Sequence, residues 1–294
     1  MVSFRPTSLP TPLRKALSRG LVQGLMLLAL PLPGLAADSL PSELDSADRR
    51  AELMGWEAVG RLDMAGEGTC TGALIRDDLV LTAAHCVVDD GNIPLDADRI
   101  LFRAGLRNGD YVAASRAYAV AVTPGYDKRD GVSGENIRHD VALIKLASPI
   151  PEALARPFRV HRSSKPSGEL MVASYGRGRN AAPSIQRECH VLDYSDDIYS
   201  FDCDITYGSS GAPVFAYDGV RPAIVSVVSS IGVRDGRKTG YGMSLLDRIA
   251  ALKRQIATGA PEVAAKPAVV KRITVGEGTA RRAVGASKFL RPGG

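Results

Sequence analysis

Three short strings of the sequence carry the side chains that nucleophilic acyl transfer requires. The strings are LTAAHC at 81–86, HDVALIKL at 139–146 and GSSGAP at 208–213. Acyl transfer needs a hydroxyl nucleophile, a base that titrates near neutrality and a carboxylate that orients the base. It also needs backbone N–H donors aimed at the developing oxyanion, which a glycine-containing turn around the hydroxyl helps to supply. His85, Asp140 and Ser210 are therefore the candidate base, orienting group and nucleophile.

Short apolar, β-branched runs separated by Gly, Asp and Pro must position these groups, and they make up the chain between residues 50 and 243. Many short strands with turn signals between them predict an all-β sandwich or barrel. One helix is predicted over 244–256, where Ser244 is a capping residue and apolar residues then recur at helical spacing. The runs expected to form strands are 56–62, 71–75, 79–82, 100–102, 118–122, 141–146, 170–174, 213–215 and 224–228.

The basic residues of the chain are concentrated at its two ends. Residues 1–36 have a net charge of +4 and residues 255–294 of +5, whereas the stretch between them has a net charge of −4. The pI of about 9.1 therefore belongs to the termini. Composition gives no support for a nucleic-acid partner, and we predict none.

The first 36 residues have the layout of a secretory signal peptide. Basic residues up to Arg19 precede an apolar run at 21–30, and Gly34 and Ala36 occupy the −3 and −1 positions of a cleavage site. The alternative is a membrane anchor, but this run is about half of the roughly 20 residues that span a bilayer. We expect bacterial export to the periplasm or beyond, with no stable membrane insertion once the signal is removed. Export implies an oxidising compartment in which disulfides persist.

The remainder of the chain divides into three further segments. We interpret residues 37–50 as an N-terminal segment or short propeptide, and residues 51–256 as the folded domain. Residues 257–294 are basic and lack a sustained period, which predicts a disordered tail. A solvated tail without a partner and a contact with a membrane or an anionic polymer both fit this composition.

The three strings, in the order His, Asp, Ser, resemble those of the trypsin-like (chymotrypsin-fold) serine proteases. The nearer resemblance is to bacterial secreted members, including the V8-type glutamyl endopeptidases, and it extends over residues 56–256. It implies two six-stranded antiparallel β-barrels, at about 51–150 and 160–243, with a C-terminal helix packed behind them.

The same resemblance implies a role for each candidate residue. His85 would be the general base, Asp140 its orienting carboxylate and Ser210 the nucleophile. The backbone N–H groups of Gly208 and Ser210 would form the oxyanion hole.

The four cysteines fit the same family. The resemblance implies a disulfide between Cys70 and Cys86 beside the histidine, which leaves Cys189 and Cys203 to pair with each other. Four cysteines allow three pairings, so the residues alone leave the choice open. No two cysteines have the C-x₂₋₄-C spacing of a zinc site, and we predict no metal.

The chain departs from the trypsins at Ser209. Trypsins carry an aspartate there, and its ion pair with a newly formed N-terminal amine builds the oxyanion hole. A serine cannot form this ion pair. We therefore expect an enzyme that is competent once it folds, or after trimming near Arg49 and Arg50.

Specificity depends first on Asp204, which lies where trypsin has the carboxylate of its primary pocket. Such a carboxylate would pair with a substrate Arg or Lys. Ser226 and Val228 would form one pocket wall, and Gly240 would line the far side. These residues favour cleavage after Arg or Lys slightly, and a glutamyl-type preference is the alternative.

These observations predict a secreted serine endopeptidase that cleaves proteins or peptides through an acyl-enzyme. We expect it to act as a monomer, without metal or organic cofactor. The alternative from another class is a chymotrypsin-fold binding or scaffold protein without turnover. An esterase would use the same chemistry, and comparing amide with ester turnover separates it from a peptidase.

Overall fold

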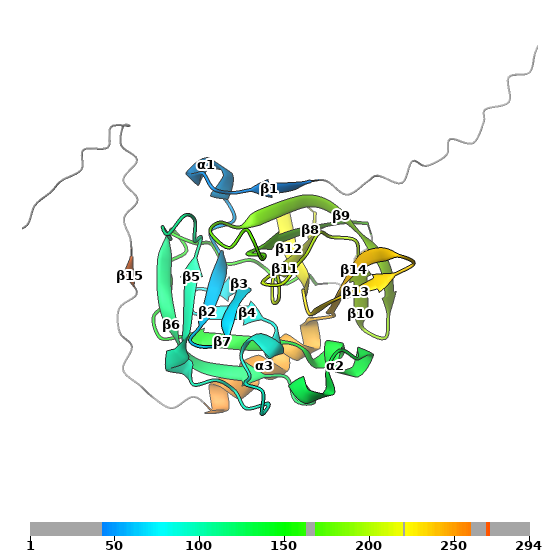
Figure 1. Cartoon of the computed structure of the whole chain (residues 1–294). Helices are drawn as coiled ribbons and strands as arrows, with labels where there is room; N and C mark the ends of the chain where they lie inside the picture. Colours follow the sequence, from blue (N-terminus) through cyan, green and yellow to red (C-terminus); the bar gives the residue numbers. More distant parts are fainter. Residues whose placement is uncertain (1–42, 163–167, 220, 260–268, 271–294) are drawn as a thin grey trace, which may run out of the picture. The chain divides into compact units, whose positions relative to one another are not determined.

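The computed structural model describes residues 43–162, 168–219, 221–259 and 269–270. Its strands form two antiparallel sheets, which lie side by side in Figure 1. The predicted signal peptide and most of the predicted basic tail lie outside the described residues.

The first sheet contains a closed barrel of six strands. They hydrogen-bond in the order β6–β5–β2–β3–β4–β7, and pairing of β6 with β7 closes the ring. Along β5, buried residues alternate with half-buried ones, as expected for a strand with one face on the core. The strands are β2 (Val59–Met64), β3 (Gly68–Arg76), β4 (Leu79–Thr82), β5 (Ile100–Ala104), β6 (Ala113–Val122) and β7 (Ala142–Leu146); β15 (Val269–Val270) adds to β6.

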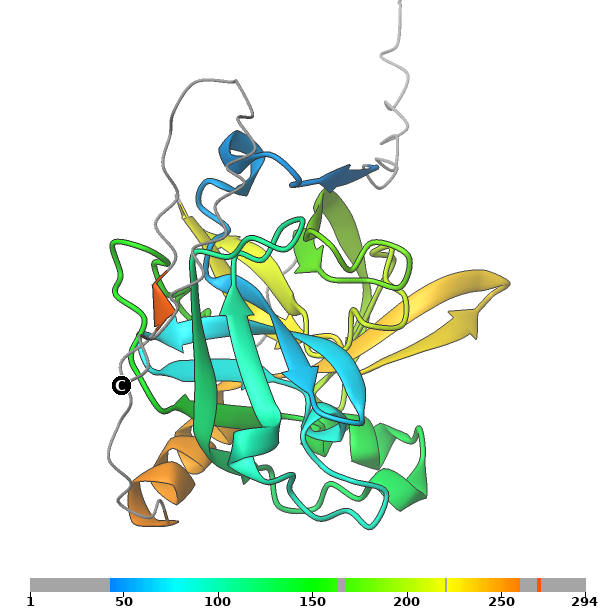
Figure 2. The same cartoon turned by 60° about the vertical axis from the view of Figure 1, so that its left-hand side comes forward.

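The second sheet follows the order β12–β11–β8–β9–β10–β14–β13, and β1 pairs separately with β9. Figure 2 shows the β13–β14 hairpin projecting from this sheet. The strands are β1 (Leu44–Ser46), β8 (Glu169–Ser174), β9 (Ser184–Ser195), β10 (Ile198–Phe201), β11 (Pro213–Asp218), β12 (Arg221–Val227), β13 (Ser230–Arg234) and β14 (Arg237–Met243).

Within the described residues, the helices before the last one are short. The α-helices are α1 (Arg50–Leu53), α2 (Gly134–His139) and α3 (Leu246–Gly259), and the 3₁₀ turns are η1 (Ala84–Cys86), η2 (Ala97–Arg99) and η3 (Lys128–Asp130). The buried face of α3 includes Ile249 and Leu252, which belong to the core that both sheets share. The helix continues to Gly259, so the first residues of the predicted tail are helical.

Three aromatic rings connect the two sheets. Trp56 precedes β2, Phe158 lies in the connection between the sheets and Phe215 belongs to β11. The Phe158 and Phe215 ring centroids are 4.7 Å apart, and the Trp56 ring meets Phe215 edge to face at 5.3 Å. Such pairs stabilise a fold by about 0.5–1.5 kcal/mol beyond their buried area. This cluster helps to fix the sheets relative to each other and so supports the cleft between them.

The all-β fold class predicted from the sequence is confirmed, with one closed antiparallel barrel, a second antiparallel sheet and a C-terminal helix. The second sheet carries strands beyond the predicted six, because β1 and β13 add to its edges. β1 has only three residues and no recognisable period. Its place in the sheet comes from pairing with β9, which a local sequence pattern does not reveal.

Candidate active site

His85 lies in η1, directly after β4, all of whose residues are buried. The disulfide between Cys70 and Cys86 ties this turn to β3. The chain leaves the barrel core at the end of β4, and the turn brings the imidazole to the surface, where 26% of the side chain is exposed. The histidine is therefore accessible while its backbone is held on both sides.

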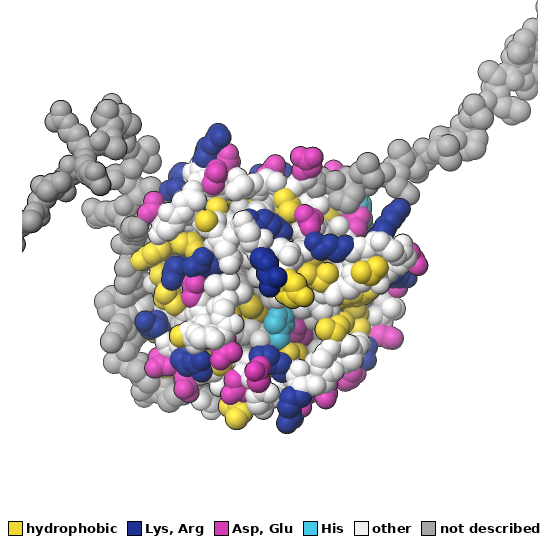
Figure 3. Space-filling model, in the orientation of Figure 1, with side chains coloured by type: hydrophobic (Ala, Val, Ile, Leu, Met, Phe, Trp, Pro, Cys, Tyr) yellow, Lys and Arg dark blue, Asp and Glu magenta, His cyan; other side chains and the backbone are white. Residues whose placement is uncertain are grey.

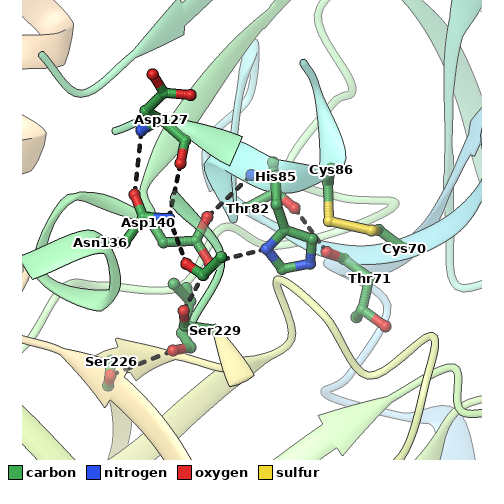
Figure 4. Close-up of polar contacts among 12 residues, drawn as sticks. Cys70, Thr71, Thr82, His85, Cys86, Asp127, Asn136, Asp140, Ser226 and Ser229 are labelled. Atoms are coloured by element: carbon green, nitrogen blue, oxygen red, sulfur yellow. Dashed lines mark hydrogen bonds and ion pairs between the residues drawn. A yellow bond between two sulfur atoms is a disulfide. The ribbon is translucent and has the colours of Figure 1, made fainter. Parts of the chain in front are cut away.

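Asp140 stands between α2 and β7, and its side chain is almost fully buried. Its Oδ2 is 2.8 Å from His85 Nδ1, and its Oδ1 accepts the backbone N–H of His85 at 2.9 Å. Both carboxylate oxygens thus bond the same residue, which fixes the position and the orientation of the imidazole. Figure 4 shows this pair with the Cys70–Cys86 disulfide on the opposite side of the ring.

Ser229 also bonds the buried carboxylate. It lies between β12 and β13, and its hydroxyl donates to Asp140 Oδ2 at 2.6 Å (Figure 4). The sequence analysis missed this residue, since the only local signal was a serine pair that ends an apolar run. The second sheet therefore supplies a hydrogen-bond donor, Ser229, to the Asp140 carboxylate, which directly precedes the first sheet's β7.

These contacts set the protonation of His85. Burial and, as the smallest contribution, the charge of Lys128 lower the pKa of the imidazole, but the charge and hydrogen bond of Asp140 outweigh both effects. The net result is a pKa above the ordinary value of 6.5. With Nδ1 donating to Asp140, the neutral ring presents an unprotonated Nε2, which is the form that a general base requires.

Ser210 lies in a tight turn before β11. Gly208 has a φ of +87°, and a Cβ at that position would lie 2.6 Å from the Tyr175 carbonyl oxygen. Only glycine fits both the backbone conformation and the space. Within the described residues, neither the Gly208 nor the Ser210 backbone N–H has a hydrogen-bond partner, so both donors are free to meet a ligand.

Thr71 of β3 fixes this turn from the opposite sheet. Its backbone N–H donates to the Ser210 carbonyl at 2.9 Å, and its hydroxyl donates to the Gly208 carbonyl at 2.9 Å. The same hydroxyl accepts the Tyr175 N–H at 2.9 Å. Because the two carbonyls of the turn bond Thr71, its N–H groups are directed away from β3. The sequence analysis placed Thr71 on a strand without a functional role.

Ser209 is fully buried beneath the turn. Its hydroxyl is 3.0 Å from Ser174 Oγ and accepts the Thr206 N–H at 3.2 Å. The buried position that carries an aspartate in trypsins is thus satisfied here by neutral hydrogen bonds.

A cavity of about 500 Å³ brings the three candidate residues together. His85, Asp140 and Ser210 all line it, together with Val228 from the predicted pocket. No hydrogen bond joins the Ser210 hydroxyl to His85 among the described residues. In unliganded sites such bonds are often long and tighten only when substrate binds.

The other predicted pocket residues lie outside this cavity. The side chain of Asp204 is 55% exposed, and its carboxylate is paired with Lys238 Nζ at 2.8 Å. Ser226 is fully buried, and Gly240 packs so closely on Phe201 that a Cβ there would lie 2.3 Å from the ring. Asp204, Ser226 and Gly240 are thus not part of the cavity that the three candidate catalytic residues line, and their role in substrate binding stays a prediction.

The cysteines form two disulfides, Cys70–Cys86 and Cys189–Cys203, which are the pairings that the resemblance implied. Cys70, Cys86 and His85 carry atoms within 4.8 Å of one another. Since a metal-binding cysteine must be a free thiolate, the disulfide leaves the imidazole as the one usable ligand of this group.

A family model and the sequences of known proteins both relate this chain to trypsin-like peptidases. A family model described as a trypsin-like peptidase domain matches residues 70–223, just over half of the chain. Serine protease SP24D of Anopheles gambiae is 37% identical over 120 residues, which are 39% of this chain and 40% of that protein. Cathepsin G of Mus musculus is 27% identical over 198 residues, or 63% of this chain and 72% of that protein.

Solved structures show the same fold. A Glu endopeptidase in complex with MPD has a TM-score of 0.57 at 17% identity, covering 69% of this chain and 92% of that one. Protease Anisep from Arthrobacter nicotinovorans has a TM-score of 0.55 at 17% identity, covering 69% and 96%. At such identities the likeness concerns the fold alone.

Proposed function

Because this chain belongs to the trypsin-like peptidase family, we propose that it is a serine endopeptidase with His85, Asp140 and Ser210 as its catalytic residues. The observation that carries the proposal is one buried carboxylate that bonds the histidine twice, beside a serine lining the same cavity. This arrangement provides a base, its orienting group and a nucleophile within one site.

The proposed reaction is acyl transfer through an acyl-enzyme. Ser210 Oγ attacks the scissile carbonyl carbon while His85 Nε2 takes the hydroxyl proton, and the N–H groups of Gly208 and Ser210 bind the oxyanion. Collapse breaks the C–N bond, and the imidazolium gives its proton to the leaving amine. Water then attacks the acyl-enzyme with His85 again as base, which releases the new carboxylic acid and restores Ser210. Asp140 stays ionised throughout and stabilises the imidazolium.

For substrate preference next to the scissile bond, the two alternatives are a basic residue and an acidic one. Cleavage after Arg or Lys depended on Asp204, whose carboxylate is exposed and paired with Lys238. The cavity is lined by Thr206, Ser229 and Ser230, and also by Lys128, whose ammonium is paired with Asp90 at 3.0 Å. Among the described lining residues the one carboxylate is that of Asp140, which His85 and Ser229 already bond. This lining supports a neutral or acidic side chain in the cavity over a basic one.

Activation in this proposal needs no new N-terminus. Ser209 is satisfied by Ser174 and Thr206, so the oxyanion turn has no role for an N-terminal amine. Trimming after Arg50 would remove β1, and Arg50 itself is paired with Glu57 at 2.6 Å. The variant Arg49→Gln/Arg50→Gln should therefore keep full activity, and a secreted but inert variant would show that trimming is required.

The setting that we propose is an oxidising compartment outside the cytoplasm. The two disulfides support it, as does the signal-peptide layout of residues 1–36. In the part of the chain that the structure describes, no helix has both the length and the apolar character needed to cross a bilayer.

The deciding experiment labels the purified, disulfide-bonded protein with a fluorophosphonate probe and then digests a proteome-derived peptide mixture. We expect labelling at Ser210 and defined cut sites, with both absent in Ser210→Ala. Ser226→Ala is the matched control, because Ser226 is a buried serine outside the cavity, and it should be labelled like the wild type. No label and no cuts from folded protein would favour the scaffold alternative.

A further inference from the structure

Beside the nucleophile turn lies a loop, residues 176–180, that carries two arginines. The Arg177 N–H donates to the Tyr207 carbonyl at 2.6 Å. A Cβ at Gly208 would lie 3.5 Å from the Arg177 nitrogen, so the loop packs directly against the turn. Whatever charge this loop carries is therefore placed next to the proposed oxyanion donors.

Arg177 carries a charge that no carboxylate neutralises. Its guanidinium carbon lies 4.3 Å from the centroid of the Tyr207 ring, and the Tyr207 side chain lines the cavity. Stacking on an aromatic face orients the cation while leaving its N–H donors free. Within the described residues, Arg177 has no ion pair, and it is exposed. Its donors are therefore available to a ligand.

Arg179 is the second cation of the loop. Its Nη2 donates to the Asp204 carbonyl at 3.2 Å, and its Nη1 is buried with no hydrogen-bond partner in the described part of the chain. The nearby Asp204 carboxylate is bonded to Lys238 instead. A buried guanidinium nitrogen without an acceptor is costly, and a ligand oxygen would remove that cost.

The surroundings of the loop are also positive. Arg61 donates to the Asn180 carbonyl at 3.0 Å, and it shares the carboxylate of Asp63 with Arg103. The single carboxylate of Asp63 is thus paired with two guanidinium groups beside the loop. Figure 3 shows several Lys and Arg side chains on the face that exposes a histidine.

The position of the loop indicates which part of a substrate it meets. His85 Nδ1 faces Asp140, so Nε2, which protonates the leaving amine, faces away from that carboxylate. Thr71 of β3 lies on the side of the ring away from Asp140 (Figure 4), and the loop is attached to β3 because Asn180 Nδ2 donates to Thr69 Oγ1 at 3.1 Å. The leaving-group half of a bound peptide must therefore pass the loop.

We propose that Arg177, with Arg179 beside it, selects substrates that carry an acidic residue shortly after the scissile bond. This inference rests on the peptidase function proposed above. A carboxylate of the departing segment would bond the Arg177 guanidinium at the rim of the cleft. Because the pair is partly exposed to solvent, we expect about a two- to fivefold gain in kcat/KM over a neutral isostere.

The test uses internally quenched peptides that are identical up to the scissile bond. Each carries Glu, Gln or Lys at one of the first three positions after it, and kcat/KM is measured at low and high salt. For at least one position we expect Glu to exceed Gln, with the ratio falling as salt rises. In Arg177→Gln the ratio should approach one, and in Arg177→Glu the Lys peptide should become the better substrate.

Arg254→Gln is the matched control, because it removes an exposed arginine from α3 and should keep the wild-type ratio. Turnover of the Gln peptide by each variant reports whether its active site is intact. An unchanged Glu-to-Gln ratio in Arg177→Gln, or no acidic preference in the wild type at any position, would refute the inference alone. Failure of the wild type to cleave every peptide would overturn the proposed function as well.

Discussion

Replacing Asp140 by Asn removes a charge and one acceptor from the best-connected group of the site. The carboxylate accepts three hydrogen bonds, from His85 N, His85 Nδ1 and Ser229 Oγ, at 2.9, 2.8 and 2.6 Å. An amide has one oxygen, and its NH₂ cannot accept. If the oxygen keeps the His85 backbone N–H, the NH₂ faces Nδ1, and the imidazole must move its proton to Nε2.

The magnitude follows from this tautomer change. A protonated Nε2 cannot take the Ser210 proton, and the imidazolium loses its stabilising charge. We expect kcat to fall by about 10⁴-fold. That loss corresponds to about 5.5 kcal/mol of transition-state stabilisation. Folding stability should change less, by about 1–3 kcal/mol, because Ser229 can rotate to accept from the amide.

The assay measures kcat/KM of the purified Asp140→Asn protein on a peptide taken from the cut-site mixture, across pH. Asp202→Asn is the matched control. Asp202 likewise accepts a histidine backbone N–H, from His190 at 2.5 Å, but it does not line the cavity. This control should retain wild-type turnover.

A folded, disulfide-bonded Asp140→Asn protein that keeps more than a tenth of wild-type kcat would refute the reasoning. Such a result would mean that His85 keeps its tautomer without the carboxylate. An equal loss in Asp202→Asn would also contradict it, because the effect would then not be specific to the site.

Three further predictions concern the same molecule. Ser229→Ala should lower kcat/KM by about tenfold, because Asp140 loses a charge-assisted hydrogen bond. Ser226→Ala should not lower it. Equal effects of the two variants on turnover would contradict the role given to Ser229. The pH–rate profile should rise through a pKa above 6.5, because activity needs the neutral form of His85. Protonated His85 stabilises the fold, so its contribution to the free energy of unfolding is present below pH 6.5 and is lost as the pH rises through the folded pKa. Burial raises the pKa of Asp78, but bonds from Lys145 and Arg76 outweigh it and lower the pKa below 3.8. Asp78→Asn should therefore cost about 1–3 kcal/mol in urea unfolding at neutral pH with turnover unchanged, and the difference should vanish as pH falls through the folded pKa.

The sequence was sufficient for the fold class and the family because both depend on local patterns. Short apolar runs with turn residues between them predicted an all-β fold. The strings around His85, Asp140 and Ser210 indicated the trypsin-like family, and the family model confirms it. The catalytic roles of these three residues stay predictions, as do the oxyanion donors and the segment boundaries. The structure adds that all three line one cavity.

What the sequence could not determine depends on contacts between distant segments. Asp204 was assigned by its offset from Ser210, but its side chain points to solvent and to Lys238. Ser229 bonds Asp140 across 89 positions of the chain. Thr71 bonds the Gly208 carbonyl across 137 positions. No local pattern marks such residues, because a strand shows only which faces are buried.

The sequence alone thus determined which reactive side chains this chain carries and in what order, since the residue types and their order are properties of the chain itself. Only the tertiary structure decided which groups surround that chemistry. It placed Ser229 on the carboxylate, Thr71 under the nucleophile turn and Arg177 beside it. The physical reason is that hydrogen bonds and ion pairs act over a few ångströms in space, and the packing of two separate sheets sets those distances.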